Sequence, residues 1–383
     1  MIRSIKKRLS AHQVNIRAYS MVFALFVIWM VLSLMTDGMF LSARNLSHLS
    51  RQMAIVGIIA CGMVLVIVSG NIDLSVGSLL GMLGGFAAIT QAYWSWSTPL
   101  TISATLLLAV LIGIMHGVLI AYQSIPAFIV TLSGLMAYRG VLIGMTGGRS
   151  ITPMHPDFLF LGQGYLPNSW GIALAVLCIG VFALFTVRLQ AARKKLGFEV
   201  ESTRKTLVKI LVFAVIVGVF TAVMNTFRGI PVPVILLLCV VLILTFVSHK
   251  TKFGRRLYAI GGNYEAAQYA GINIKKTIAI VFVINAVLSG IAGLVLTARL
   301  NSGTVAAGTM AELDVIAAAV IGGASLAGGI GSVPGAILGA LIMASLNNGM
   351  SLLNTEAYWQ YIVRGIILAL AVWFDVTSNK KQS

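Results

Sequence analysis

Residues 52–69 read QMAIVGIIACGMVLVIVS, a run with no charged side chain. A helix that crosses the hydrocarbon core of a membrane needs about 20 apolar residues. Comparable runs recur along the whole chain, so we expect an all-α, polytopic integral membrane protein with about 10–12 transmembrane helices, some of them short re-entrant or broken helices. The predicted spans are 19–36, 52–69, 73–92, 99–120, 127–147, 169–187, 207–225, 232–248, 277–297, 312–325, 333–352 and 357–375, of which 312–325 is short for a full crossing.

The composition agrees with a membrane protein. Hydrophobic residues make up 58% of the chain and charged residues only 10%, with a mean hydropathy of +0.97, which excludes a soluble domain. A net charge of +17 would suggest a nucleic-acid partner in a soluble protein, whereas here it follows from membrane orientation and predicts contact with lipid. Cys61, Cys178 and Cys239 lie far apart inside apolar runs, so they are interpreted as structural thiols rather than metal ligands.

Positive charge predicts the orientation. Twenty of the 27 Lys and Arg residues fall within 1–17, 188–209, 249–276 and the tail after 376. Cytoplasmic segments carry such an excess, so both termini are expected inside the cell: 1–18 as a cytoplasmic segment, 188–206 and 249–276 as cytoplasmic loops, and 376–383 as a cytoplasmic tail of one transmembrane domain spanning 1–383. The predicted outer loops hold the basic residues Arg44, Arg51, Arg149, Arg228 and Arg299, and the outer span ends hold the aromatic residues Trp94, Trp96, Tyr165, Trp170, Tyr358 and Trp359.

Two glycine-containing breaks interrupt the apolar pattern. In SGNIDLSVGS (69–78), Asp73 or Ser75 is positioned to cap the next helix, and GGASLAGGIGS (322–332) ends at Ser332, a predicted N-cap followed by Pro334. Irregular backbone survives at membrane depth only inside protein or beside a water-filled cavity. Two interpretations stay open: these glycines permit close helix packing, or they line a transport pathway.

The spans offer neutral hydrogen-bonding groups and few ionisable ones. Arg139 and Arg364 lie toward span ends, and His116 is interpreted as a hydrogen-bonded core residue. Neutral polar residues suit an uncharged polyhydroxyl solute better than an ion. The candidate pathway residues are Asn71, Asp73, Ser75, Thr131, Asn285, Asn347 and Asn348, with Ser133 and Gln360 as further polar positions.

The segment GGNYEAAQYAG (261–271) predicts a short helix outside the membrane. Asn263 is a suitable N-cap, Glu265 places a negative charge in the first turn, and Gly271 is a suitable stop. A helix of about two turns is marginal alone in water, so it needs the membrane surface or a partner protein to pack on.

Three motifs carry a resemblance. SGNIDLSVGS, GNYEAAQYAGI and ELDVIAAAVIGGASLAGGIGSVPGAILGALI occur in the order found in the inner-membrane permeases of bacterial sugar ABC importers, in the ribose/galactose/xylose branch. FLSARNLSHLSRQ, GRRLYAIGGNYEAA and WQYIVRGIILALAVWFD are most similar to the D-xylose permeases, as is the extra hairpin near 169–225. Some multiple-monosaccharide permeases share that insertion, so a related or multiple-sugar importer is the alternative.

The resemblance implies a function and partners. The chain would be the permease of an importer in the bacterial inner membrane, and it would depend on another subunit for energy, since it has no GxxxxGK[ST] phosphate loop. It would bind no cofactor itself; ATP would be used by a partner ATPase subunit, onto which the coupling helix docks through Asn263, Tyr264, Glu265, Ala266, Ala267 and Gly271. A permease homodimer and a periplasmic sugar-binding protein, docking on 37–51, 148–168, 226–231 or 298–311, complete the expected assembly.

Other functions find less support in the sequence. An ion-coupled secondary transporter needs a coupling residue, for which Asp73 is the best candidate, although a capping role suits it better. A channel needs a selectivity motif, and an enzyme needs a constellation such as HExxH or paired carboxylates within the membrane, and neither is found in the chain.

Overall fold

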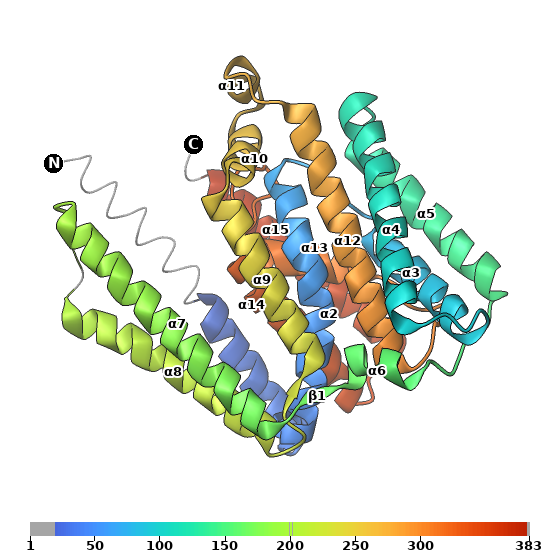
Figure 1. Cartoon of the computed structure of the whole chain (residues 1–383), viewed down its shortest axis with the longest axis horizontal. Coiled ribbons are helices and arrows are strands. Elements are labelled where there is room, and N and C mark those ends of the chain that lie inside the picture. Colours follow the sequence, from blue (N-terminus) through green and yellow to red (C-terminus); the bar gives the residue numbers. More distant parts are fainter. Residues whose placement is uncertain (1–19, 199, 201, 381–383) are drawn as a thin grey trace.

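The computed structural model describes residues 20–198, 200 and 202–380, which are predominantly helical (Figure 1). The predicted cytoplasmic segment 1–18 and the last residues of the predicted tail lie outside this range. The described residues contain a small sheet of two antiparallel strands, β1 (Tyr165–Leu166) and β2 (Ile230–Pro231), each two residues long.

Each predicted span is a helix, which confirms the all-α, polytopic architecture. Nine helices of the described range are long and apolar enough to cross a membrane, and Ser20–Met35 and Val76–Ala92 are shorter apolar helices. The helices in the spans are Ser20–Met35, α2 (Ala43–Val68), α3 (Val76–Ala92), α4 (Thr98–Gly117) continued by the π-helix η2 (Val118–Tyr122), α5 (Ala127–Thr146), α7 (Asn168–Lys195), α8 (Thr203–Asn225), α9 (Val232–Lys250), α12 (Ile274–Leu300), α13 (Ala311–Ile321), α14 (Val333–Leu352) and α15 (Ala357–Lys380).

Short helices lie outside the predicted spans. These helices are η1 (Met39–Leu41), α6 (Pro156–Gln163), α10 (Lys252–Gly262) and α11 (Tyr264–Tyr269).

Helix caps place several helix ends away from the predicted span edges. The helix predicted from residue 52 begins at Ala43, because the Ser42 side chain accepts a hydrogen bond from the Asn45 amide. The predicted loop 188–206 is largely helical, because α7 continues to Lys195 and the Ser202 side chain caps α8.

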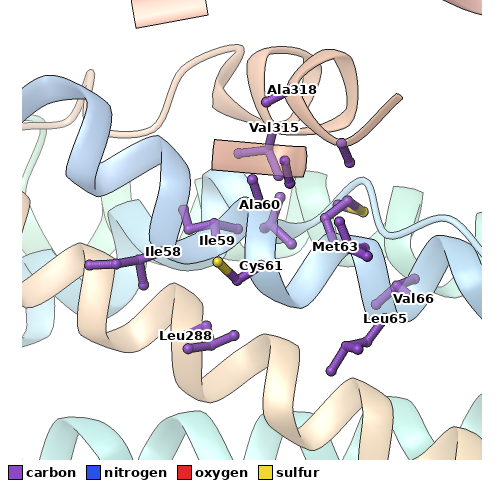
Figure 2. Close-up of a cluster of buried hydrophobic side chains, with 14 of the residues drawn as sticks. Ile58, Ile59, Ala60, Cys61, Met63, Leu65, Val66, Leu288, Val315 and Ala318 are labelled. Carbon is purple, nitrogen blue, oxygen red and sulfur yellow. The ribbon is translucent and has the colours of Figure 1, made fainter. Parts of the chain in front are cut away.

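Helix α2 is the centre of the molecule. In its most apolar window 83% of the residues are buried. Figure 2 shows Cys61 and its neighbours on α2 between Leu288 of α12 and Val315 and Ala318 of α13. These side chains form one continuous core through which α2, α12 and α13 are held together.

Two chain crossings are broken near the core. Helix α3 begins only after the irregular residues 69–75, and α13 follows the irregular residues 301–310. At 1.5 Å per residue, the 11 residues of α13 extend over about 16 Å, roughly half of the hydrocarbon core. The segment before α13 meets α3 where Gly308 lies against Gly77, so closely that a Cβ on Gly308 would overlap the Gly77 carbonyl oxygen.

The α7–α8 hairpin stands apart from this core (Figure 1). None of the most apolar window of α7 is buried, and 11% of that of α8 is. The two helices pack on each other through Phe182 and Phe213, whose rings stack with centroids 4.2 Å apart. The apolar outer faces of the hairpin are therefore suited to lipid, while Arg193, Lys194 and Lys195 close α7 with positive charge.

Candidate functional site

Helices α10 and α11 lie at one end of the bundle, and α6 and β1 at the other (Figure 1). Thr251 caps α10 by accepting from the Gly254 amide, and Asn263 caps α11 by accepting from the Ala266 amide at 2.8 Å. Gly271 takes a positive φ of 72° directly after the helix. The predicted short helix is thus confirmed, with Tyr264–Tyr269 as its bounds.

One face of α11 anchors it and the other is presented to solvent. Ala267 is 4% exposed and packs with Ile260 of α10 and Ile274 of α12. The sequence analysis predicted Ala267 at the contact with the ATPase subunit. Its buried side chain instead holds α11 to the rest of its own chain. Tyr264 is 55% exposed and Tyr269 90% exposed, an unusual position for aromatic side chains unless another surface covers them.

Helix α10 connects α11 to the membrane core. Gly261 lies so close to the end of α2 that a Cβ there would overlap the Val68 carbonyl oxygen. The same carbonyl accepts a hydrogen bond of 2.9 Å from the amide of Gly329, in the break between α13 and α14. Tyr258 donates to the carbonyl oxygen of Gly331 at 2.8 Å, and burial raises the pKa of this tyrosine. A displacement of α10 would therefore act on α2 and on this break together.

The second break is also held from α15. The Asp375 carboxylate accepts from the Leu326 amide at 3.1 Å and from the Ser325 hydroxyl at 3.3 Å. Ser332 caps α14 as predicted, accepting from the Gly335 amide, with Pro334 in the first turn. The segment 322–332 is thus a fixed junction between α10, α2, α14 and α15.

The first break contains a buried polar cluster. One carboxylate oxygen of Asp73 accepts from the Ser75 amide at 2.9 Å and from its hydroxyl at 2.6 Å. The other accepts from the Asn285 side-chain amide at 2.9 Å. Ser75 occupies the N-cap position of α3 without a side-chain cap, so the Asp73 carboxylate satisfies the chain where it turns into the helix. All three side chains are at most 2% exposed.

Three other pathway candidates are dispersed. Thr131 donates within its own helix to the Ala127 carbonyl, Asn71 donates to the Ser69 hydroxyl, and Asn348 accepts from Asn45 at 2.9 Å. His116 is 1% exposed and hydrogen-bonds with the Tyr138 hydroxyl at 2.6 Å, which confirms its interpretation as a core residue. Of the seven candidates, only Asn347 lines one of the two cavities described for the chain.

That cavity, of about 390 Å³, lies at the end of α12 remote from α11. Helices α2, α3, α12, α13, α14 and α15 and the segment 304–309 line it. Its polar lining includes Gln52, Arg299, Thr304, Asp314, Asn347 and Arg364. We call it the polar cavity.

Three of these side chains form a linked group. The Asn347 side-chain amide donates to Asp314 at 2.9 Å, and Arg364 Nε donates to the side-chain oxygen Oδ1 of Asn347 at 3.0 Å. Arg364 Nε also lies 3.7 Å from the second oxygen of Asp314. The sequence interpretation gave Asp314 no role and noted Arg364 only for its place toward a span end. A charged side chain inside an apolar helix was the signal that could have identified both residues. Such a charge costs free energy in the membrane, so it usually has a functional role.

The segment before α13 is held by another arginine. Arg139 of α5 donates to the carbonyl oxygens of Val305 and Ala307 at 2.9 and 2.8 Å. These bonds satisfy irregular backbone that would otherwise be unpaired at membrane depth. Arg139 therefore stabilises the wall of the polar cavity.

The chain is similar to known transport proteins over nearly its whole length. A family described as "Branched-chain amino acid transport system / permease component" matches residues 45–372. The Xylose transport system permease protein XylH of Haemophilus influenzae is 51% identical over 369 residues, covering 96% of this chain and 98% of the relative. XylH of Escherichia coli K12 is 47% identical over 367 residues, covering 96% and 93%.

A more distant relative is the Ribose import permease protein RbsC of Bacillus subtilis, 33% identical over 361 residues, covering 92% of this chain and 90% of the relative. No solved structure matches the chain. The matches extend over the spans, both breaks and the α10–α11 segment alike. The chain is a multi-pass inner-membrane protein and belongs to this family of transport-system permease components.

Proposed function

We propose that the chain is the permease subunit of an ATP-driven ABC importer that carries D-xylose across the bacterial inner membrane. The two xylose permeases are about half identical to it over nearly their whole length, whereas the ribose permease is one-third identical. The similarity to the xylose permeases includes the α7–α8 region, because the alignments cover 96% of this chain.

The observation that carries the proposal is the exposed helix α11. Its outward residues Tyr264, Glu265 and Tyr269 provide a small amphipathic surface that a groove on an ATPase subunit would cover. The chain contains no phosphate-binding loop of its own, so the energy for transport would come from that subunit. Through Tyr258 and Gly261, α10 would transmit the movement of α11 to α2 and to the break before α14.

The assembly we propose has two copies of this permease, each with an ATPase subunit at α11. A periplasmic sugar-binding protein would deliver the sugar on the opposite face, where the polar cavity lies. The face around α6 and β1 and the segments 37–51, 148–168, 226–231 and 298–311 are its proposed docking surface.

Reconstitution tests the proposal. Proteoliposomes that contain the permease, its ATPase and the sugar-binding protein should import D-xylose only when ATP is supplied. Uptake by the permease alone, driven by a proton or sodium gradient, would contradict it.

Replacing the exposed Glu265 with Lys tests the coupling helix. It reverses the charge in the first turn of α11 without disturbing the core, so ATPase co-purification and uptake should fall by at least about tenfold, a loss of some 1.4 kcal/mol in binding. The matched control is Glu356→Lys, an exposed carboxylate before α15 at the other end of the bundle, which should keep the ATPase bound. Normal co-purification of Glu265→Lys would place the ATPase contact elsewhere.

A further inference from the structure

The polar cavity contains a charged group that the fold alone does not require. Asp314 is 5% exposed, and Arg364 lies beside it on the cavity wall, 3.7 Å away, with 17% of its side chain exposed. Placing a carboxylate and a guanidinium inside an apolar bundle costs free energy that their mutual attraction offsets only in part. A pair of leucines would pack there at lower cost, so the group is expected to bind something.

The group has hydrogen-bonding capacity left over. One oxygen of Asp314 accepts no hydrogen bond from any described residue. The hydrogen bond described for Arg364 uses only Nε, whereas a guanidinium has five N–H donors. An acceptor and several donors are thus left side by side at the cavity wall, with Asn347 between them.

This pattern selects for a particular kind of ligand. A hydroxyl group both donates and accepts, so neighbouring hydroxyls of a sugar can donate to Asp314 and accept from Arg364 at once. A carboxylate or phosphate only accepts, and it would face the negative charge of Asp314. The remaining wall includes Ile55, Val56 and Leu296, which are suited to the C–H faces of a sugar ring.

The volume is also appropriate. Ligand pockets generally measure about 300–1,000 Å³, and at about 390 Å³ the polar cavity stands at the small end of this range. It therefore fits one monosaccharide better than an oligosaccharide. Leu80 of α3 and Gly308 of the segment before α13 form part of its wall, so a bound sugar would contact the junction that joins α3 and α13.

We propose that the permease itself has a monosaccharide-binding site in the polar cavity, in which Asp314, Asn347 and Arg364 bind vicinal hydroxyls of D-xylose. The identity of the sugar rests on the proposed function; the site and its ligand class rest on the cavity. Sugar selection would then take place in the membrane as well as in the binding protein.

Protection from thiol labelling tests the site directly. Thr309→Cys would place a thiol at an exposed position that lines the cavity. Cys178→Ser and Cys239→Ser would remove the other thiols that a reagent could reach. Cys61 would be kept, because it is fully buried. D-Xylose should slow labelling of the introduced thiol by a water-soluble methanethiosulfonate, and D-xylonate should not. Equal labelling with and without D-xylose, or protection by D-xylonate alone, would overturn the proposal.

A variant and a matched control complete the test. Asn347→Leu should abolish the protection and lower ATP-driven uptake by at least about tenfold. Leucine cannot form a hydrogen bond to Asp314, to Arg364 or to a sugar hydroxyl, so these buried polar groups lose a partner. Ser351→Ala, an exposed polar position one turn further along α14, should retain both. Co-purification of the ATPase subunit with Asn347→Leu checks that the assembly is intact.

The outcomes separate the two proposals. Suppose that the wild type imports D-xylose, that D-xylose does not protect the introduced thiol, and that Asn347→Leu takes up D-xylose normally. The proposed binding site would then be wrong, and the importer proposal would stand. An assembled wild-type system that carries no D-xylose would remove the proposed substrate, while the labelling assay would still decide whether the cavity binds a monosaccharide.

Discussion

The hydroxyl of Tyr258 donates a hydrogen bond of 2.8 Å to the carbonyl oxygen of Gly331, which joins α10 to the break between α13 and α14. Tyr258 is a side chain through which α10 holds this break, and α10 also meets the break through the backbone of Gly261 and Gly262. The hydrogen bond is therefore a specific point at which coupling can be weakened without loss of packing.

Tyr258→Phe removes that hydroxyl and keeps the ring. Loss of one partly buried hydrogen bond should lower the free energy of unfolding by about 1 kcal/mol. We expect fewer D-xylose molecules imported per ATP hydrolysed, because movement of α11 would reach the break less completely. The measurement is uptake and phosphate release on the same proteoliposomes.

The control is Tyr93→Phe, since Tyr93 is 68% exposed at the end of α3 and lies outside the proposed ATPase contact. If Tyr258→Phe transports with an unchanged ratio, α10 transmits movement by packing alone.

The contact between Gly77 and Gly308 predicts a position that tolerates no side chain. A Cβ on Gly308 would overlap the Gly77 carbonyl oxygen, and its φ of 68° is also unfavourable for alanine. Gly308→Ala should destabilise the protein by about 1–3 kcal/mol or more, the usual cost of overpacking. Thermal unfolding of the purified protein in detergent measures the change.

Gly140→Ala is the matched substitution. Gly140 lies within α5, and a Cβ added there would meet no atom of another element within 4 Å, so alanine should be neutral or stabilising by up to about 1 kcal/mol. Equal stability of the two variants would show that Gly308 is not closely packed against α3.

Much of the fold was predictable because long apolar runs form membrane-spanning helices. Every predicted span corresponds to a helix, and Asn263, Glu265 and Gly271 correctly predicted the short helix α11. The span edges were less accurate, because caps such as Ser42 and Ser202 begin helices within polar sequence that hydropathy assigns to loops.

The candidate site was predictable only in part. Asp73, Ser75 and Asn285 were selected for their polarity, and the fold brings them together, but their side chains face one another inside protein. Asn347 and Asn348 are neighbours in sequence, yet one lines the polar cavity and the other bonds to Asn45. Which face of a helix meets a cavity depends on tertiary packing, and neutral polarity alone does not encode it.

The buried Asp73 cluster predicts a structural effect. Asn285→Ala removes a hydrogen bond to a carboxylate that is 2% exposed, which should cost about 2 kcal/mol of stability, as expected for a bond to a charged group. Asn71→Ala, at a partly exposed position whose side chain donates to the neighbouring Ser69, should change stability by less than about 1 kcal/mol. Thermal unfolding of both variants checks the difference.

The same variants address the pathway prediction for these residues. If Asn285→Ala is less stable but transports at the wild-type rate at low temperature, its role is structural. A loss of uptake without loss of stability would return it to the pathway.

The α7–α8 hairpin should be dispensable for ATPase docking. Its connecting end lies away from α11, and its helices pack mainly on each other (Figure 1). Deleting 188–206 and joining the helices with a short flexible linker removes the basic end of the hairpin but leaves α10, α11 and the break at 322–332 in place. We therefore expect co-purification of the ATPase to stay within about twofold of the wild type, a difference below about 0.5 kcal/mol.

Membrane insertion is verified first by labelling an introduced thiol in α11 from the cytoplasmic side, because the deleted charges also contribute to orientation. If a correctly inserted deletion variant loses the ATPase, the hairpin belongs to the docking surface, and α11 alone does not account for the contact.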